Sequence, residues 1–222
     1  MLFPITCALA QSQRWGIWPD LFFDEYLSDE HMVIDDTERA QMQAWREQLK
    51  AVLAQHFPQE PLSPLVVVRI EEQRLYLFPT AEDEELRIFP ISTSRHGIGS
   101  EEGSYKTPQG VHRIRQKIGA GQPKGAIFRA RIPTGEIARL VTEPERTPRD
   151  NITSRILWLE GLEEGVNRGP GIDSFARYIY IHGTDEEGLI GTPASDGCVR
   201  MRNQDVIWLY EQLPQGTLVI IQ

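Results

Sequence analysis

Two segments decide the fold and the chemistry of this chain: Tyr178-Ile179-Tyr180-Ile181-His182-Gly183-Thr184 and, after a polar loop, Ser195-Asp196-Gly197-Cys198-Val199-Arg200-Met201. The first segment alternates aromatic and β-branched residues, which is typical of a strand, and it ends in a histidine. In the second, a glycine precedes a cysteine, and glycine lets the backbone turn sharply and expose the sulfur. The sequence therefore predicts a histidine at the end of one strand and a cysteine that opens the next element.

The pair His182 and Cys198 supplies the two parts of an activated nucleophile. A free thiol has a pKa of about 8.5, and a neighbouring imidazole that takes its proton raises the nucleophilicity of the sulfur. The backbone amides around Gly197 and Cys198 are candidates for stabilising an oxyanion. The residues by themselves leave a second interpretation open, in which Cys198 is a small buried hydrophobic residue and His182 a hydrogen-bonded strand-end histidine.

Working outward, the chain from residue 64 onward predicts a mostly β domain, a sandwich or barrel with a few short helices. Pro58, Pro61 and Pro64 end a preceding helix, and short runs of β-branched and aromatic residues follow them. A short helix is expected at 205–213. The expected strands are 65–70, 74–78, 86–92, 110–114, 156–159, 178–182 and 217–221.

Residues 1–63 predict an N-terminal arm and an amphipathic helix ahead of the domain at 64–222. Residues 11–34 are rich in aromatics without a clean period. Asp35, Asp36 and Thr37 offer an N-cap for a helix. Apolar residues then recur at three- and four-residue spacing and form one stripe: Met42, Trp45, Leu49, Val52 and Leu53.

Residues 1–10 are ambiguous as a targeting segment. They end in Ala8-Leu9-Ala10, which matches a signal peptidase site, yet they lack a basic start and contain Pro4. An uncleaved or partial export signal and a plain buried segment both remain open. If residues 1–10 are an export signal, the expected location is the cell envelope or periplasm; the alternative location is the cytoplasm.

The stretch at about 115–150 carries several glycines and prolines and little periodicity. It is too long for an ordinary connection, so we interpret it as a lid-like insertion that faces substrate. The acidic run 82–85 is expected to be a solvated hairpin tip.

Composition excludes several classes of function. The 32 acidic and 23 basic residues give a formal charge of -9, which opposes binding to nucleic acid. Two cysteines, Cys7 and Cys198, are too few for a disulfide scaffold or a four-cysteine zinc site. No stretch approaches the roughly 18 apolar residues of a transmembrane helix. His96 and His112 have no close-spaced ligand partner, so we expect solvated or substrate-facing roles and no metal site.

The combined pattern resembles the L,D-transpeptidase catalytic domain family over most of residues 65–222. The family signature is a His-Gly-Thr strand end followed by Ser-x-Gly-Cys and a hydrophobic-Arg-hydrophobic triplet, here 195–201. An upstream Thr-Pro-x-Gly segment is also typical, and Thr107-Pro108-Gln109-Gly110 fits it. The runs 67–70 and 74–78 are similar to the first hairpin of the family. One departure is Asp196, where many members have a second histidine.

The resemblance implies a cysteine acyltransferase that uses no cofactor and acts on peptidoglycan stem peptides. Cys198 would attack the amide before a terminal D-alanine, and His182 would be its base. The backbone carbonyl of Asp196 would orient that base, and Gly197 would lie in the oxyanion region. Arg200 would pair with the terminal carboxylate of the donor, although a structural salt bridge is an equal alternative. Ser195 is a further expected substrate contact.

Three functions stay open at this point. The first is transfer of the acyl group to an amine of a second stem, and the second is hydrolysis of the stem by water on the same fold. The third is a wall-binding module without catalysis. Tyr180 alternates with Ile179 and Ile181, so it either faces the cleft or covers a core edge. The acceptor, the oligomeric state and the role of residues 1–63 are not specified by the sequence.

Overall fold

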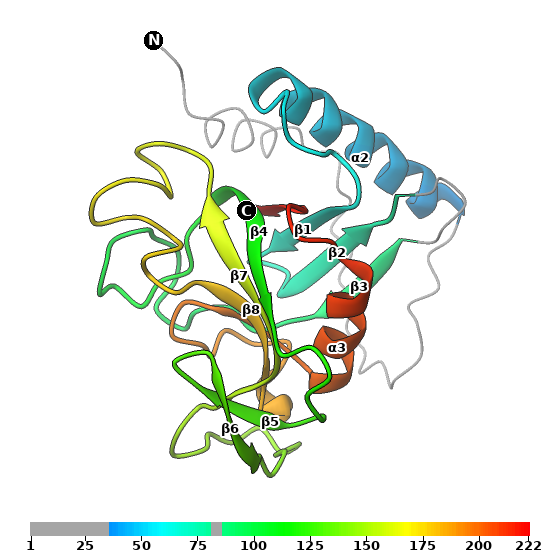
Figure 1. Cartoon of the computed structure of the whole chain (residues 1–222). Coiled ribbons are helices and arrows are strands. Elements are labelled where there is room, and N and C mark those ends of the chain that lie inside the picture. Colours follow the sequence, from blue (N-terminus) through cyan, green and yellow to red (C-terminus); the bar gives the residue numbers. More distant parts are fainter. Residues whose placement is uncertain (1–35, 81–85) are drawn as a thin grey trace.

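The protein is a mostly β structure built on one curled sheet (Figure 1). The computed structural model describes residues 36–80 and 86–222. Within these ranges the helices are α2 (Asp36–His56), η1 (Glu187–Leu189) and α3 (Asn203–Gln212). The strands are β1 (Leu65–Arg69), β2 (Arg74–Phe78), β3 (Arg87–Pro90), β4 (Gly110–Ile118), β5 (Ala126–Arg129), β6 (Ile132–Ile137), β7 (Ile152–Gly161), β8 (Tyr180–Thr184), β9 (Val199–Met201) and β10 (Leu218–Ile221).

The sheet runs in the order β3-β2-β1-β10-β4-β7 and then branches at β7. One branch is β8 followed by β9, and the other is the β5–β6 hairpin. The pairs β1–β10 and β8–β9 are parallel, and the other pairs are antiparallel. The segment after β3 returns to β9, where Ser92 and Arg200 exchange backbone hydrogen bonds of 2.9 and 2.8 Å. The sheet therefore curls back on itself at β9.

The interior of the curl is filled by aliphatic side chains and by α3. Alternate residues of the strands point inward, as the two-residue period of a strand requires, and α3 adds Val206, Leu209 and Tyr210. Met201 and Val199 of β9 and Ile181 of β8 belong to this core and are fully buried. Their strand neighbours Arg200 and His182 consequently point to the opposite face.

The long helix α2 covers the outer face of the β1–β2 hairpin (Figure 1). Its apolar stripe, predicted from the sequence, places Met42, Leu49 and Leu53 against Leu65 and Val67 of β1. The apolar run of β1 is covered on both faces, by α2 on one side and by the interior core on the other. The helix ends at His56, before Pro58, as predicted.

The segment 115–150 contains regular structure that the sequence did not reveal. β4 continues to Ile118, and β5 and β6 form a hairpin, so the segment has more regular structure than its weak periodicity indicated. Its role as a lid-like insertion stays a prediction. All six residues of β6 are exposed, and they include a proline and a glycine. Without a buried face the strand has no alternation of polar and apolar residues, which is the signal that strand prediction uses.

Several expectations fall outside the described residues, namely the aromatic arm at 11–34, the signal at 1–10, the N-cap at Asp35 and the acidic tip at 82–85. In the ranges that are described, no helix combines the length and the apolar character needed to cross a membrane.

His112 of β4 is completely buried, which corrects the expectation of a solvated or substrate-facing residue. Its Nδ1 lies 3.0 Å from the Gly110 carbonyl, and its Nε2 lies 2.9 Å from the Ser174 hydroxyl. Burial lowers the pKa of His112 to about 4. The imidazole is therefore neutral in the folded protein, and it donates to Gly110 and accepts from Ser174.

We expect His112 to make the stability of the protein depend on pH between about 6.5 and 4. In the unfolded chain a histidine binds its proton near pH 6.5, whereas in the fold His112 binds it only near 4. The unfolded state thus holds more protons in this window, and stability falls as the pH falls, by up to about 1.4 kcal/mol per pH unit. Urea unfolding of the unsubstituted protein and of His112→Gln, measured from pH 7 to 4, tests this. A difference between them that does not change with pH would contradict it.

Candidate active site

The site lies on the outer face of β7, β8 and β9, and strand register assembles it. Trp158 of β7 pairs with Tyr180 of β8, and Ile156 pairs with His182. His182 in turn pairs with Arg200 of β9, which places Cys198 beside Tyr180. Side chains at paired positions of neighbouring strands point to the same face. The nucleophile and the base predicted from the sequence therefore share one face of adjacent strands, one diagonal step apart.

The sulfur of Cys198 is held by the backbone of the preceding strand. The Tyr180 amide donates to the sulfur at 3.4 Å, and the thiol donates to the Tyr178 carbonyl at 3.4 Å. Among the described residues no hydrogen bond joins the sulfur to His182. Cys198 is partly exposed at the margin of an aromatic cluster that contains Trp158 and Tyr180.

The turn before Cys198 is fixed by residues of the two sequence motifs. Gly197 has φ +116°, a conformation that favours glycine, and a Cβ there would lie 3.3 Å from the Lys106 carbonyl. The buried hydroxyl of Thr107 donates to the Gly197 carbonyl at 3.0 Å and accepts from the Ser94 amide. Through Thr107, the Thr-Pro-x-Gly segment thus stabilises the turn that precedes Cys198.

His182 is 3% exposed, and its orientation is set locally. Its Nδ1 donates to the Gly183 carbonyl at 2.7 Å, which leaves Nε2 as the nitrogen that can accept a proton. The orienting carbonyl is therefore that of Gly183, where the sequence predicted that of Asp196. Gly183 itself has no room for a side chain, because a Cβ would lie 2.7 Å from the Thr153 carbonyl and 2.8 Å from Asn203 Oδ1.

Both members of the pair are neutral in the resting protein. Burial raises the pKa of the Cys198 thiol to about 12, and burial lowers the pKa of His182. The carboxylate of Asp150 opposes a thiolate and favours an imidazolium, because it raises both pKa values. A neutral thiol beside a neutral imidazole suits general-base catalysis, in which the proton moves as the sulfur attacks.

Ser195 and Asp196 have structural roles that differ from those predicted. The Ser195 hydroxyl is buried and donates to the Cys198 carbonyl at 2.6 Å, so it braces the turn and is closed to substrate. The Asp196 carboxylate is half-exposed and binds Arg95 at 2.9 Å and His96 at 3.1 Å. His96 is thus the solvent-facing histidine that the sequence suggested.

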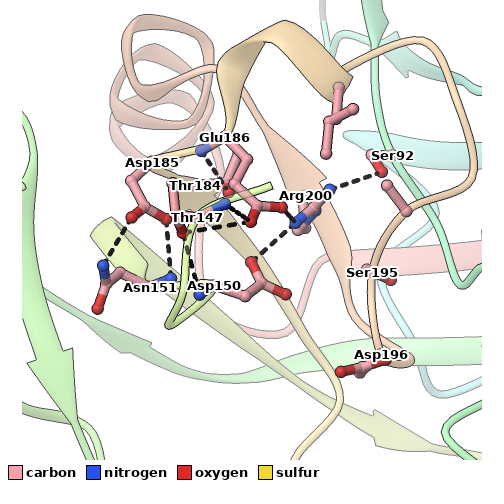
Figure 2. Close-up of polar contacts among 12 residues, drawn as sticks. Ser92, Thr147, Asp150, Asn151, Thr184, Asp185, Glu186, Ser195, Asp196 and Arg200 are labelled. Carbon is pink, nitrogen blue, oxygen red and sulfur yellow. Dashed lines mark hydrogen bonds and ion pairs between the residues drawn. The ribbon is translucent and has the colours of Figure 1, made fainter. Parts of the chain in front are cut away.

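Arg200 is not available to a substrate carboxylate, because its side chain is 0% exposed. Figure 2 shows its guanidinium enclosed by protein oxygens. Nη1 lies 2.7 Å from both Asp150 Oδ1 and Glu186 Oε2, and Nη2 lies 3.3 Å from the Ser92 hydroxyl. Of the two roles considered for Arg200, the structure shows the second, a salt bridge within the protein.

Sequence reasoning missed three residues that contribute to the site. Arg177 stabilises negative charge there, since it lowers the pKa of Cys198. Tyr178, at φ +59°, supplies the carbonyl that accepts a hydrogen bond from the thiol. Arg131, from the β5–β6 hairpin, lies over the aromatic cluster next to Cys198. Tyr178 opens the segment that ends in His182, but nothing in the sequence pattern connects the two arginines to the site.

In the described part of the chain, no group of three or more His, Cys, Asp or Glu side chains is arranged to hold a metal ion. A cavity of about 590 Å³ lies between α3 and the β2–β3 hairpin, away from the cysteine. Its lining residues are Pro64, Leu77, Pro79, Thr80, Arg87, Trp208, Gln212 and Leu213.

Comparison with known proteins gives one consistent family. The L,D-transpeptidase catalytic domain matches residues 63–221. The probable L,D-transpeptidase ErfK/SrfK of Escherichia coli (strain K12) is 30% identical over 163 residues, which cover 70% of this chain and 43% of that protein. The probable L,D-transpeptidase YbiS of the same strain is 49% identical over 66 residues, 27% of this chain and 22% of the relative. The chain thus spans less than half the length of these relatives.

Solved structures give the same family name. An L,D-transpeptidase from Mycobacterium smegmatis covers 71% of this chain, with 58% of its own length, at 17% identity and a TM-score of 0.40. An L,D-transpeptidase (residues 123-326) from Xylanimonas cellulosilytica covers 79% of this chain, with 69% of its own length, at 20% identity and a TM-score of 0.37.

We expect the Cys198 thiol to react slowly with alkylating agents at neutral pH. With a pKa raised to about 12 by burial, the thiolate fraction rises about tenfold per pH unit below that value. The rate of iodoacetamide labelling should therefore climb from pH 7 to 10 without a plateau. Mass analysis of the peptide that contains Cys198 separates it from Cys7. A plateau below pH 8 would instead indicate a preformed thiolate–imidazolium pair.

Arg200→Gln should destabilise the fold by about 3–5 kcal/mol, because it leaves Glu186 buried without its partner. The side chain of Glu186 is only 2% exposed. Urea unfolding measures the loss. The matched control is Arg168→Gln, which removes an exposed ion pair with Glu164 and should cost less than about 1 kcal/mol. Native stability in Arg200→Gln together with weaker substrate binding would restore the carboxylate-anchor role.

Proposed function

Because this chain belongs to the L,D-transpeptidase catalytic domain family, we propose that it is a cysteine acyltransferase that cross-links peptidoglycan stem peptides. The observation that carries the proposal is the placement of Cys198 and His182 on one face of β8 and β9, with Nδ1 of His182 already bonded to Gly183. With Nδ1 occupied by that bond, Nε2 is the ring nitrogen that can accept a proton. We also propose that the protein acts in the cell envelope, because its proposed substrate is peptidoglycan.

In the proposed reaction the sulfur attacks the amide carbon between an L-configured centre of the donor stem and its terminal D-alanine. The thiol proton passes to Nε2 of His182 as the carbon–sulfur bond forms, and the carbonyl oxygen becomes an oxyanion. The carbon–nitrogen bond then breaks, and the imidazolium returns the proton to the amine of the leaving D-alanine. A thioester on Cys198 remains.

The second half of the reaction reverses these roles. The side-chain amine of a second stem attacks the thioester, His182 takes a proton from that amine, and the sulfur leaves and recovers the proton. Asp150 supports both halves, since its carboxylate favours the imidazolium form of His182. The negative charge meanwhile lies on substrate oxygen and does not require a free thiolate on the enzyme.

A tetrapeptide stem should release D-alanine, whereas a pentapeptide stem that ends in two D-alanines should not. One residue of extended chain is about 3.3 Å, so the longer stem moves its L-centre amide away from the sulfur when its carboxylate is bound. Free D-alanine is measured for each purified stem, and the thioester is detected by the mass of the intact protein. Cys198→Ala should abolish both signals while the fold is retained, since the thiol is partly exposed.

The acceptor is tested in the same assay by adding an amine-bearing stem. A cross-linked dimer supports transpeptidation, and D-alanine release that never yields dimer reassigns the protein to stem hydrolysis. Equal release from both stems would refute the L,D specificity. Binding of a stem without acylation of Cys198 would indicate the third function, a wall-binding module without catalysis.

A further inference from the structure

The β5–β6 hairpin ends in an unusual turn that carries an arginine to the site. Arg129 pairs with Ile132, so Ala130 and Arg131 form a two-residue loop. Their φ angles are +46° and +70°. A turn with two positive φ angles normally uses Asn-Gly or a similar pair, because side chains disfavour this conformation. Strain of this kind persists where the surroundings hold it, and it clusters at functional sites.

The guanidinium of Arg131 rests on the aromatic surface beside the nucleophile. It lies 4.8 Å from the ring centre of Trp158 and 4.8 Å from that of Tyr178. Nη1 lies 3.5 Å from the Tyr180 hydroxyl. The same tyrosines contact the sulfur of Cys198 through their backbones. The hairpin therefore delivers a positive charge to the surface from which Cys198 is reached.

Among the described residues, the side chain of Arg131 hydrogen-bonds to tyrosine hydroxyls alone, whereas the other cations near the thiol bind carboxylates or backbone carbonyls. Within residues 36–80 and 86–222, Arg131 forms no salt bridge with a carboxylate. Arg200 is enclosed by Asp150 and Glu186. Arg177 donates to the Gly99 carbonyl, the Ser104 hydroxyl and the Lys106 carbonyl at 3.3, 3.5 and 2.8 Å. A guanidinium has five N–H donors in a planar fork that matches a carboxylate, and ring stacking keeps that fork in place.

We propose that Arg131 binds the terminal carboxylate of the donor stem peptide. The inference rests on the proposed function and replaces Arg200, which the sequence had suggested for this role. The carboxylate would bind the N–H groups at the edge of the guanidinium, while the rings of Trp158 and Tyr178 hold the guanidinium in place. The β5–β6 hairpin then acts as the specificity element within the segment 115–150.

The test compares a tetrapeptide stem as the free acid with the same stem as its C-terminal amide. The variant is Arg131→Asn, because asparagine tolerates positive φ and so keeps the turn while removing the charge. The matched control is Arg129→Gln, on the same hairpin, where the arginine binds Asn151 at 2.7 Å. Affinity is measured by calorimetry in a Cys198→Ala background, and acylation by the mass of proteins that retain Cys198.

The protein with Arg131 should prefer the acid over the amide by roughly 10- to 100-fold, the size expected for a charged hydrogen bond. Arg131→Asn should reduce this preference to less than about threefold by weakening binding of the acid alone, and Arg129→Gln should retain it. An unchanged preference in Arg131→Asn, or no preference in the parent protein, overturns the anchor. Preferential binding of the acid without any thioester on Cys198 keeps the anchor and refutes the acyltransferase.

Discussion

The buried guanidinium of Arg200 joins the segments that make up the site. The backbone of Arg200 pairs with Ser92, where the sheet closes, and the side chain of Arg200 binds Asp150 and Glu186. These partners come from the segment after β3, the segment before β7 and the segment after β8. A buried charge that loses its partner is costly, so these segments are held in one arrangement. Cys198 lies two residues before Arg200 on the same face, and its position relative to His182 follows from that arrangement.

The same network sets the electrostatics of the reaction. Asp150 is held by Arg200 and acts on both reacting groups, since its charge disfavours a thiolate on Cys198 and favours an imidazolium on His182. In the proposed reaction, negative charge would therefore be better placed on the substrate oxyanion than on the sulfur, and His182 would accept positive charge. A site arranged in this way would keep its thiol protonated until a carbonyl carbon is present, which would protect the sulfur from unproductive chemistry.

The sequence predicted the parts of the fold in which one residue's role follows from its neighbours along the chain. The runs of β-branched and aromatic residues gave β1 and β2, and helical spacing gave the stripe of α2. The sequence left two roles open for Arg200, because its partners, Asp150 and Glu186, are 50 and 14 residues away along the chain. The β5–β6 hairpin was missed because β6 has no buried face.

The glycines of the signature motifs are explained by packing as much as by chemistry. Gly183 lies against Thr153 of β7 and Asn203 at the start of α3, so a side chain there would displace the strand that carries His182. At Gly197 the constraint is the φ of +116°, together with the close carbonyls of Tyr105 and Lys106. Motifs with such steric origins specify the thiol and its base but do not select a substrate. Selection must then come from what surrounds the motifs, where Tyr105, Ile132 and Tyr178 are exposed. The β5–β6 hairpin, which bears Arg131 and Ile132, contributes to these surroundings. Under the proposed function, changes in this hairpin should alter which stem peptides react while the chemistry proposed for Cys198 stays the same.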